Sequence, residues 1–143
     1  MAYWGNLGHQ ICIHDASTDL QLPAVTDSHL GEGYLDNLDQ YDLIVRSPGV
    51  RPELIFKANP GLDTAKITSV TNEFLAECPA KVIGVTGTKG KGTTSSLIAA
   101  ILQEAGHTVH LGGNIGRPAL DFLANVQPED WVVLELSSFQ LMD

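Results

Sequence analysis

A loop rich in glycine and lysine carries the clearest chemistry in this sequence. The apolar run 82–85 predicts a buried strand that leads into this loop, and a helical pattern follows at once. The loop residues are Gly87, Thr88, Lys89, Gly90, Lys91 and Gly92. Glycines allow a tight turn with inward-facing N–H groups, and a helix start adds unpaired N–H donors and partial positive charge. Such a loop binds phosphate, and Lys91 would reach the terminal phosphates of a nucleotide. The alternative is a glycine-rich turn that binds no ligand.

A hydroxyl and a carboxylate near this loop are candidate Mg²⁺ ligands. The loop departs from the standard phosphate-binding pattern, because Val85 stands for its first glycine and Gly92 for its Ser or Thr. The hydroxyl must then come from Thr93 or Thr94. Glu135 ends another buried apolar run, and ligands gather at the carboxyl ends of parallel strands. This position favours a metal role for Glu135 over a role in capping the next turn.

Three further positions at the ends of apolar runs are candidate substrate contacts. The run 112–116 holds three glycines around Asn114, whose amide can orient an oxygen-rich substrate, but a helix-entry turn explains this pattern equally well. Asp15 has the position of a ribose-binding acid in a Rossmann-like unit, although a solvated turn is the simpler interpretation. Ser47, followed by Pro and Gly, indicates only a turn on its own evidence.

Strands that alternate with helices must position these residues. Strands are predicted at 10–14, 42–46, 66–70, 81–86, 107–111 and 131–136. Helices are predicted at 54–58, 71–78, 93–105 and 118–124, with Thr71 as a cap and Pro118 at an early helical position. This alternation predicts an α/β fold with parallel sheets. Pro79 ends a helix, so we expect two domains, at 1–79 and 80–143.

Composition limits the classes of function. The net charge of −9 argues against nucleic-acid binding, and the lack of a long apolar run or a signal-peptide pattern predicts a cytoplasmic protein with no membrane partner. Cys12 and Cys78 fit no metal-ligand spacing and are expected to be free thiols. The five histidines show no paired metal spacing on a common helix, so we interpret them as structural or exposed.

Taken together, three motifs resemble those of the Mur ligase family, which builds the peptide stem of peptidoglycan. The motifs are 87–94, 112–116 and Glu135-Leu136-Ser137-Ser138-Phe139-Gln140-Leu141. The last is most similar to the members that add D-glutamate, and the turn at Ser47 fits the first domain of those members. The related folylpolyglutamate synthases are the alternative, because they share the Gly-Lys-Gly loop, but they should lack the Ser-Ser-Phe-Gln run.

The resemblance implies a fold and a reaction. The fold would be a partial Rossmann-like parallel-sheet domain followed by the start of a P-loop ATPase domain, with both ends of the chain cut. The reaction would be the ATP-dependent joining of D-glutamate to UDP-N-acetylmuramoyl-L-alanine through an acyl phosphate, by a cytoplasmic enzyme that is monomeric at full length. D-glutamate would bind a third domain, so this chain alone is expected to be inactive; a non-catalytic nucleotide-binding fragment is a second alternative.

The resemblance also assigns roles to residues of this sequence. ATP would contact Gly87, Thr88, Lys89, Gly90, Lys91, Gly92 and Thr93, with Lys91 as the catalytic residue. Mg²⁺ would be held by Thr93 and Glu135. The UDP substrate would contact Asn114, Gln140, Ser47 and Asp15. After Asp15 this sequence has Ala16-Ser17, where the D-glutamate enzymes often carry a Thr and an Arg.

Overall fold

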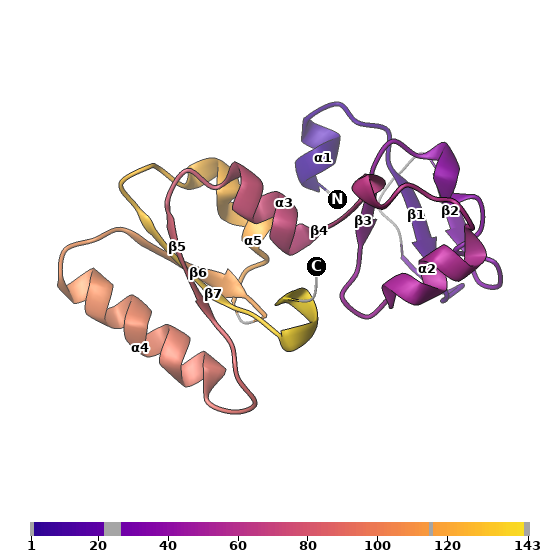
Figure 1. Ribbon diagram of the computed structural model, residues 1–143. Coiled ribbons are helices and arrows are strands. Elements are labelled where there is room, and N and C mark those ends of the chain that lie inside the picture. The colour runs from indigo at the N-terminus through magenta and orange to yellow at the C-terminus, as the bar shows by residue number, and fades with distance from the viewer. Residues whose placement is uncertain (1, 22–26, 115, 142–143) are drawn as a thin grey trace. The chain divides into compact units, whose positions relative to one another are not determined.

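The computed structural model describes residues 2–21, 27–114 and 116–141, which form two compact units (Figure 1). The first unit comprises Met1–Ile44 with Val50–Ile67, and the second comprises Val45–Gly49 with Thr68–Asp143. The division at residue 79 stays a prediction; in the structure, Thr68 and the residues after it group with the second unit. No described helix is long and apolar enough to cross a membrane.

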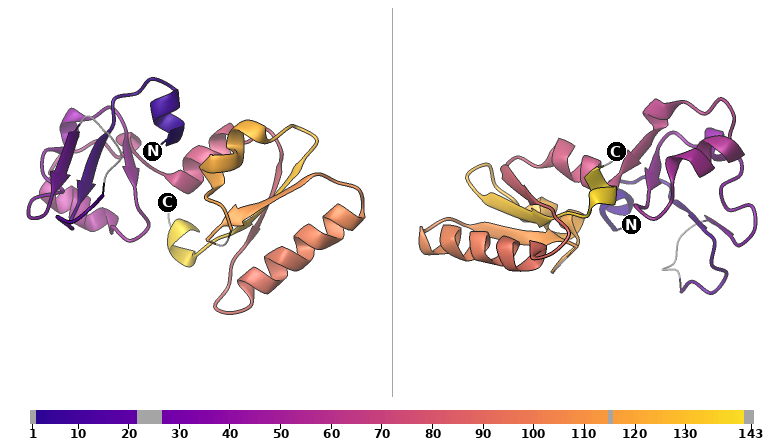
Figure 2. Two further views of the ribbon diagram at one scale, coloured as in Figure 1. Left: turned by 180° about the vertical axis from the view of Figure 1, so that it is seen from behind. Right: turned by 60° about the horizontal axis from the view of Figure 1, so that its bottom comes forward.

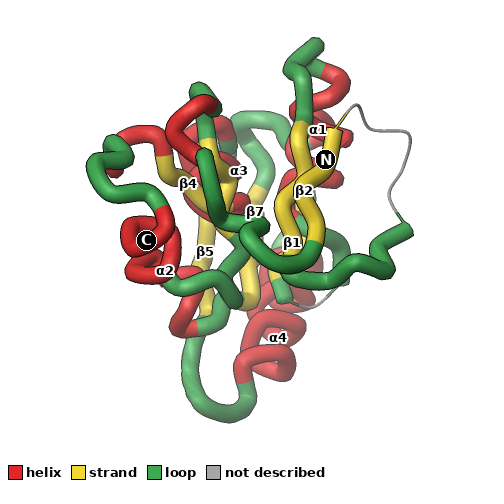
Figure 3. The backbone as a smooth tube through the Cα atoms, turned by 90° about the vertical axis from the view of Figure 1, so that its right-hand side faces the viewer, coloured by secondary structure: helices red, strands yellow, loops and turns green. Residues whose placement is uncertain are grey.

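The first unit is built around a two-stranded parallel sheet. Its elements are α1 (Ala2–Asn6), β1 (Cys12–Asp15), β2 (Asp27–Leu30) and α2 (Pro52–Ala58). Strands β1 and β2 lie side by side in parallel (Figure 3). The core contains Leu38, Ile55 and Leu62. The buried Asn59 ties the loops around it together, because its side chain accepts a hydrogen bond from the Leu38 N–H (2.8 Å) and donates to the Leu35 carbonyl (2.7 Å).

A second pair of strands, β3 (Ile44–Arg46) and β4 (Ile67–Ser69), forms another two-stranded sheet and leads into helix α3 (Val70–Glu77). The predicted cap of this helix at Thr71 is wrong. Ser69 is the cap, and its hydroxyl accepts a hydrogen bond from the Asn72 N–H at 3.2 Å. Thr71 lies inside the first turn and is buried. Ser and Thr are both good caps, so the sequence pattern alone could not separate two candidates two residues apart.

The second unit contains a three-stranded parallel sheet between helices. Its further elements are β5 (Lys81–Val85), α4 (Lys91–Glu104), β6 (Val109–Gly113), α5 (Ala119–Phe122) and β7 (Trp131–Glu135). The strand order is β5-β7-β6, and both pairs are parallel. This sheet and the parallel β1–β2 pair confirm the predicted α/β class. Helix α4 covers one face of the sheet, and α3 and α5 lie on the other (Figures 1 and 2).

The apolar pattern of the central strand explains this layering. Side chains alternate between the two faces of a strand, and Val132, Val133 and Leu134 in β7 are all fully buried. Val133 packs with Val85 and Ala99 in the core under α4. On the other face, the rings of Phe74 in α3 and Phe122 in α5 meet edge to face, 5.6 Å apart. A strand buried on both faces requires a continuous apolar run, and the sequence of β7 provides one.

Differences from the predicted elements fall mainly at boundaries. Strand β2 was missed, because Asp-Ser-His-Leu has little β propensity and its side chains are mostly exposed. Helix α4 begins at Lys91, two residues before the predicted start, with Gly90 as its cap. Pro118 is the residue before α5 and not an early helical residue.

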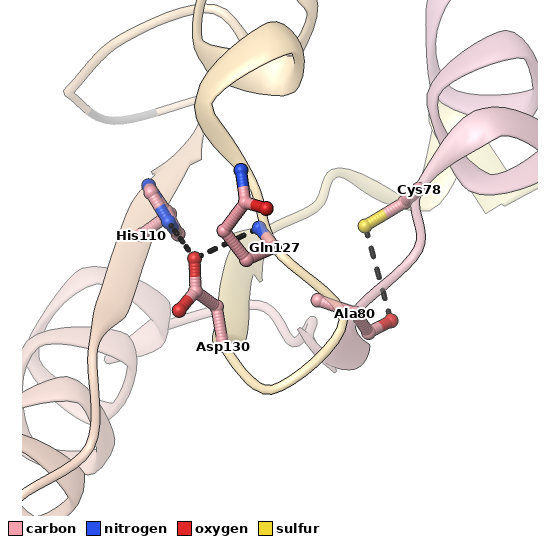
Figure 4. Close-up of polar contacts among 5 residues, drawn as sticks. All are labelled: Cys78, Ala80, His110, Gln127 and Asp130. Atoms are coloured by element: carbon pink, nitrogen blue, oxygen red, sulfur yellow. Dashed lines mark hydrogen bonds and ion pairs between the residues drawn. The ribbon is translucent and has the colours of Figure 1, made fainter.

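An aspartate and a histidine link the sheet to the turn before β7 (Figure 4). The Asp130 carboxylate accepts hydrogen bonds from the Gln127 N–H at 2.9 Å and the His110 ring at 2.8 Å. The His110 ring also stacks on Phe122, with ring centroids 5.6 Å apart. The backbone hydrogen bond from Gln127, and then the hydrogen bond from His110, lower the pKa of Asp130 below its usual value.

We therefore predict that Asp130 contributes to acid stability. A carboxylate with a lowered pKa in the folded state adds stability above its unfolded pKa, which is lost as the pH falls through the folded value. Replacing Asp130 with Asn should make the free energy of unfolding less dependent on pH below about pH 4. Urea denaturation of the chain at several pH values would measure this. The matched control is Asp121→Asn, at an exposed position on α5. Equal slopes in the two variants would contradict the prediction.

Candidate functional site

The glycine- and lysine-rich loop connects the end of β5 to the start of α4, as predicted. Gly87 has φ +150° and Gly90 has φ +76°, backbone angles that residues with a side chain rarely adopt. The Lys91 side chain folds back over the loop, and its ammonium group donates a hydrogen bond to the Gly87 carbonyl at 2.8 Å. The ammonium group of Lys91 is therefore fixed next to the backbone of the loop.

The first turn of α4 presents backbone donors beside this lysine. The first intrahelical bond runs from the Thr94 N–H to the Gly90 carbonyl (2.9 Å), so the N–H groups of the three residues between them have no partner within the helix. These donors lie at the positive end of a 14-residue helix. Together with Lys91 they form a site suited to a multiply charged phosphate group.

The hydroxyls of the first turn of α4 differ in their availability. Ser95 is fully buried and donates a hydrogen bond to the Lys91 carbonyl at 2.9 Å, so its hydroxyl is turned into the helix. Thr93 and Thr94 are exposed. The hydroxyls of Thr93 and Thr94, the two predicted candidates for a metal ligand, are therefore accessible to solvent near the loop.

Glu135 lies at the carboxyl edge of the sheet, next to the start of the loop. It is the last residue of β7, and its register partners are Val85 in β5 and Gly113 in β6. The ladder continues beyond it through a 2.9 Å hydrogen bond from the Leu136 N–H to the Val85 carbonyl. Glu135 is only 7% exposed. Register therefore brings a buried carboxylate beside the strand that leads into the glycine- and lysine-rich loop.

The two adjacent glycines of the 112–116 run are required by the protein's own packing. A Cβ atom on Gly112 would lie 2.5 Å from the Phe122 ring, and one on Gly113 would overlap the Glu135 carbonyl oxygen. Gly113 also has φ +100°. These glycines thus let β6 approach β7 and α5 closely. Ile115 lies outside the described residues.

Two of the predicted substrate residues, Asn114 and Gln140, are placed differently. The Asn114 N–H donates a hydrogen bond to the Glu135 carbonyl at 2.9 Å, and its side chain is exposed at the same edge of the sheet. The Gln140 side chain accepts a hydrogen bond from the Ser137 N–H at 2.8 Å and donates one to the Thr71 hydroxyl at 3.3 Å. Gln140 therefore joins the 3₁₀ turn after β7 to helix α3.

The two remaining predicted substrate residues lie in turns. Asp15 ends β1, and its carboxylate accepts a hydrogen bond from the Ser17 N–H at 2.8 Å, which is the arrangement of an ordinary turn aspartate. Ser47 follows β3 and is exposed, and its carbonyl accepts a hydrogen bond from Arg46 at 3.3 Å. Asp15 belongs to the first unit, and Ser47 belongs to the second.

The structure also gathers three potential metal ligands that the sequence analysis did not group. One ligand atom from each of Cys12, His14 and His29 lies within 4.8 Å of the others. The sequence held part of the signal, because residues two apart in a strand share a face. The third ligand lies on β2, which was not predicted, so the cluster could not be assembled from spacing alone.

Comparisons with known proteins show what this chain is similar to. Residues 85–143 match the Mur ligase middle domain. The relatives carry the name UDP-N-acetylmuramoylalanine–D-glutamate ligase. One from Clostridium novyi is 47% identical, covering 79% of this chain and 25% of the relative. One from Acetivibrio thermocellus is 40% identical over 99% of this chain and 32% of the relative.

A third such relative, from Clostridium botulinum, is 45% identical over 88% of this chain and 28% of its own length. The chain thus spans about a quarter to a third of the length of these relatives. The family match begins at the last residue of β5 and includes the loop, α4, β6 and β7. The glycine- and lysine-rich loop and Glu135 lie inside the matched region, and relatives of one name align with most of this chain. The chain belongs to the Mur ligase family.

Proposed function

We propose that this chain is part of a cytoplasmic enzyme that joins D-glutamate to UDP-N-acetylmuramoyl-L-alanine and consumes ATP in doing so. The product would be used in peptidoglycan synthesis. The observation that carries the proposal is the register of Glu135 with Val85, which sets a buried carboxylate beside the loop that holds Lys91. The names of the relatives supply the substrates. Folylpolyglutamate synthesis is the less supported alternative, since the relatives reported above are D-glutamate ligases.

The proposed mechanism is amide formation through an acyl phosphate. The alanyl carboxylate attacks the γ-phosphorus of ATP and ADP leaves; the amine of D-glutamate then attacks the acyl carbon and inorganic phosphate leaves. Catalysis of such a transfer depends mainly on positioning and on neutralising charge. Lys91 and the N–H groups at the start of α4 would hold the β and γ phosphates. Asn114, with Gln140, Ser47 and Asp15, would contact the UDP substrate.

The residues at this edge suit a Mg²⁺ ion. Glu135 and Thr93 offer a carboxylate and a hydroxyl, the oxygen ligands that Mg²⁺ prefers. Glu135 is mostly buried at the carboxyl edge of the sheet, where ligands of parallel sheets bind. When bound, the ion would neutralise charge on the phosphates. Glu135 and Thr93 would fix its position relative to Lys91.

Substrate-dependent phosphate release from the full-length protein that contains this segment tests the proposal. The protein would be incubated with ATP, Mg²⁺, UDP-N-acetylmuramoyl-L-alanine and D-glutamate, and parallel reactions would contain L-glutamate, or a folate with L-glutamate. We expect phosphate release that requires D-glutamate and the UDP substrate together. Release that requires a folate instead would support the alternative and overturn the proposal.

A pair of glutamate variants tests the metal assignment. In the full-length protein, Glu135→Gln should raise the Mg²⁺ concentration needed for half-maximal activity by about tenfold or more, because the amide is a weaker ligand for a hard cation. Glu129→Gln is the matched control, since Glu129 is exposed in the turn before β7. Titrating Mg²⁺ at saturating ATP would measure both. Equal shifts in the two variants would mean that Glu135 only ends its strand.

A further inference from the structure

Strand register places four polar side chains on one face of the β1–β2 sheet. Cys12 and His14 are two residues apart in β1, and their parallel partners in β2 are Asp27 and His29. Side chains two residues apart, and side chains of direct register partners, share a face of a sheet. Figure 3 shows the two strands side by side. This face therefore carries a thiol and an imidazole from β1, and a carboxylate and an imidazole from β2.

The potential ligand atoms on this face are close enough to converge on one ion. One atom each from Cys12, His14 and His29 lies within 4.8 Å of the others. Tetrahedral Zn²⁺ with ordinary bond lengths requires about 3.4–3.6 Å between such atoms. Closing this gap takes a shift of about 1 Å. His29 can supply it, because its ring is exposed and free to turn from its stacked position, 4.8 Å from the His14 ring.

Hydrogen bonds already orient His14 as metal-binding histidines are oriented. Its Nδ1 lies 2.6 Å from the Tyr34 carbonyl oxygen, which can only accept a hydrogen bond, so Nδ1 carries the proton. Its Nε2 then has the lone pair and accepts a hydrogen bond from the Tyr41 hydroxyl at 2.9 Å. Ligating histidines typically donate their other ring N–H to a carbonyl or carboxylate, which fixes the ring. Nε2 is thus the nitrogen of His14 whose lone pair could bind a metal ion, in exchange for its hydrogen bond with Tyr41.

The groups around these atoms favour a cation. Asp27 places a negative charge next to Cys12 in register. Thiolate and imidazole ligands together select zinc-like ions over Mg²⁺ or Ca²⁺.

We propose that Cys12, His14 and His29 form a binding site for a divalent transition-metal ion of the zinc type. Three protein ligands leave a fourth position for water, Asp27 or the Tyr41 hydroxyl. The ion would clamp β1 to β2, a two-stranded pair with little stability of its own. Asp15 is the next residue after His14 and so points to the other face of the sheet. The site is thus separate from the proposed ligase function, and neither depends on the other.

Cobalt titration of the metal-free chain tests this site directly. Co²⁺ in a tetrahedral site with a thiolate gives intense visible bands and a thiolate-to-metal charge-transfer band in the near ultraviolet, and Zn²⁺ should abolish both by displacement. We expect one equivalent of Co²⁺ to bind in the micromolar range. His29→Ala, at an exposed position that should not disturb folding, should weaken binding by at least about tenfold. Cys12→Ser should remove the charge-transfer band.

Matched controls separate this site from adventitious binding. Cys78→Ser removes the other free thiol, and His107→Ala removes an exposed histidine of the second unit, so both should bind Co²⁺ as the parent chain does. The proposal is overturned if the parent chain shows no tetrahedral spectrum. It is also overturned if the charge-transfer band survives in Cys12→Ser, or if His29→Ala binds as tightly as the parent.

Discussion

Replacing Lys91 with alanine in the full-length enzyme is expected to lower kcat/KM for ATP by roughly a hundredfold to a thousandfold, the cost of losing one donor to transition-state charge. Lys91 begins α4 and lies over the loop through its 2.8 Å hydrogen bond to the Gly87 carbonyl. The variant keeps the loop glycines and the helix donors, so phosphate contacts through the backbone would persist. Phosphate release at varied ATP concentrations would measure the loss.

A second lysine and a stability measurement make this result specific. Lys57→Ala removes an exposed lysine from the last turn of α2, in the other unit, and should leave kcat/KM unchanged. Thermal unfolding of Lys91→Ala should stay close to that of the parent, because the lost hydrogen bond is in an exposed loop. If Lys91→Ala turned over substrate as fast as the parent, the assignment of this loop to the catalytic site would be wrong.

Gly113→Ala is expected to give the largest loss of stability among the substitutions considered. The new Cβ would overlap the Glu135 carbonyl oxygen, and alanine is strained at φ +100°. Backbone strain and forced displacement of a packed strand each cost about 1–3 kcal/mol, so the free energy of unfolding should fall by about 3 kcal/mol or more. Urea denaturation of the 143-residue chain would measure the change.

Gly106→Ala separates crowding from backbone strain. Gly106 has φ +89°, but nothing lies within 4 Å of the position that its Cβ would take. Its substitution should therefore cost only the conformational term, about 1–2 kcal/mol. If both variants lost the same free energy, the close approach of β6 to β7 at Gly113 would be without energetic consequence.

The phosphate-binding half of the fold was predictable from sequence because its signals are local. The apolar runs of β5 and β7, the glycines between β5 and α4, and the final Glu135 all stand in short segments. The site roles given to Lys91, Thr93, Glu135, Asn114, Gln140, Ser47 and Asp15 stay predictions. What the structure adds is the register that sets Glu135 beside Val85.

The rest depended on pairings between distant segments, which periodicity does not encode. The polar strand β2 has no apolar alternation, so its pairing with β1 and the approach of His29 to His14 were not anticipated. Likewise, the run 112–116 was interpreted either as part of a substrate site or as a helix-entry turn, whereas the immediate neighbours of Gly112 and Gly113 are Phe122 and the Glu135 backbone.

The order of strands in the larger sheet has a consequence for how the chain folds during synthesis. Strands β5 and β6 are not neighbours; among the strands that the structure describes, each has β7, the last of the three in sequence, as its partner in the sheet. While a ribosome is still adding residues before Trp131, both earlier strands have been synthesised but the strand that pairs with them has not. Unpaired strand edges on a nascent chain are prone to wrong association. These three strands can pair only after β7 has been made and enters between the other two, so the strand that brings Glu135 beside the loop is also the one that joins β5 to β6.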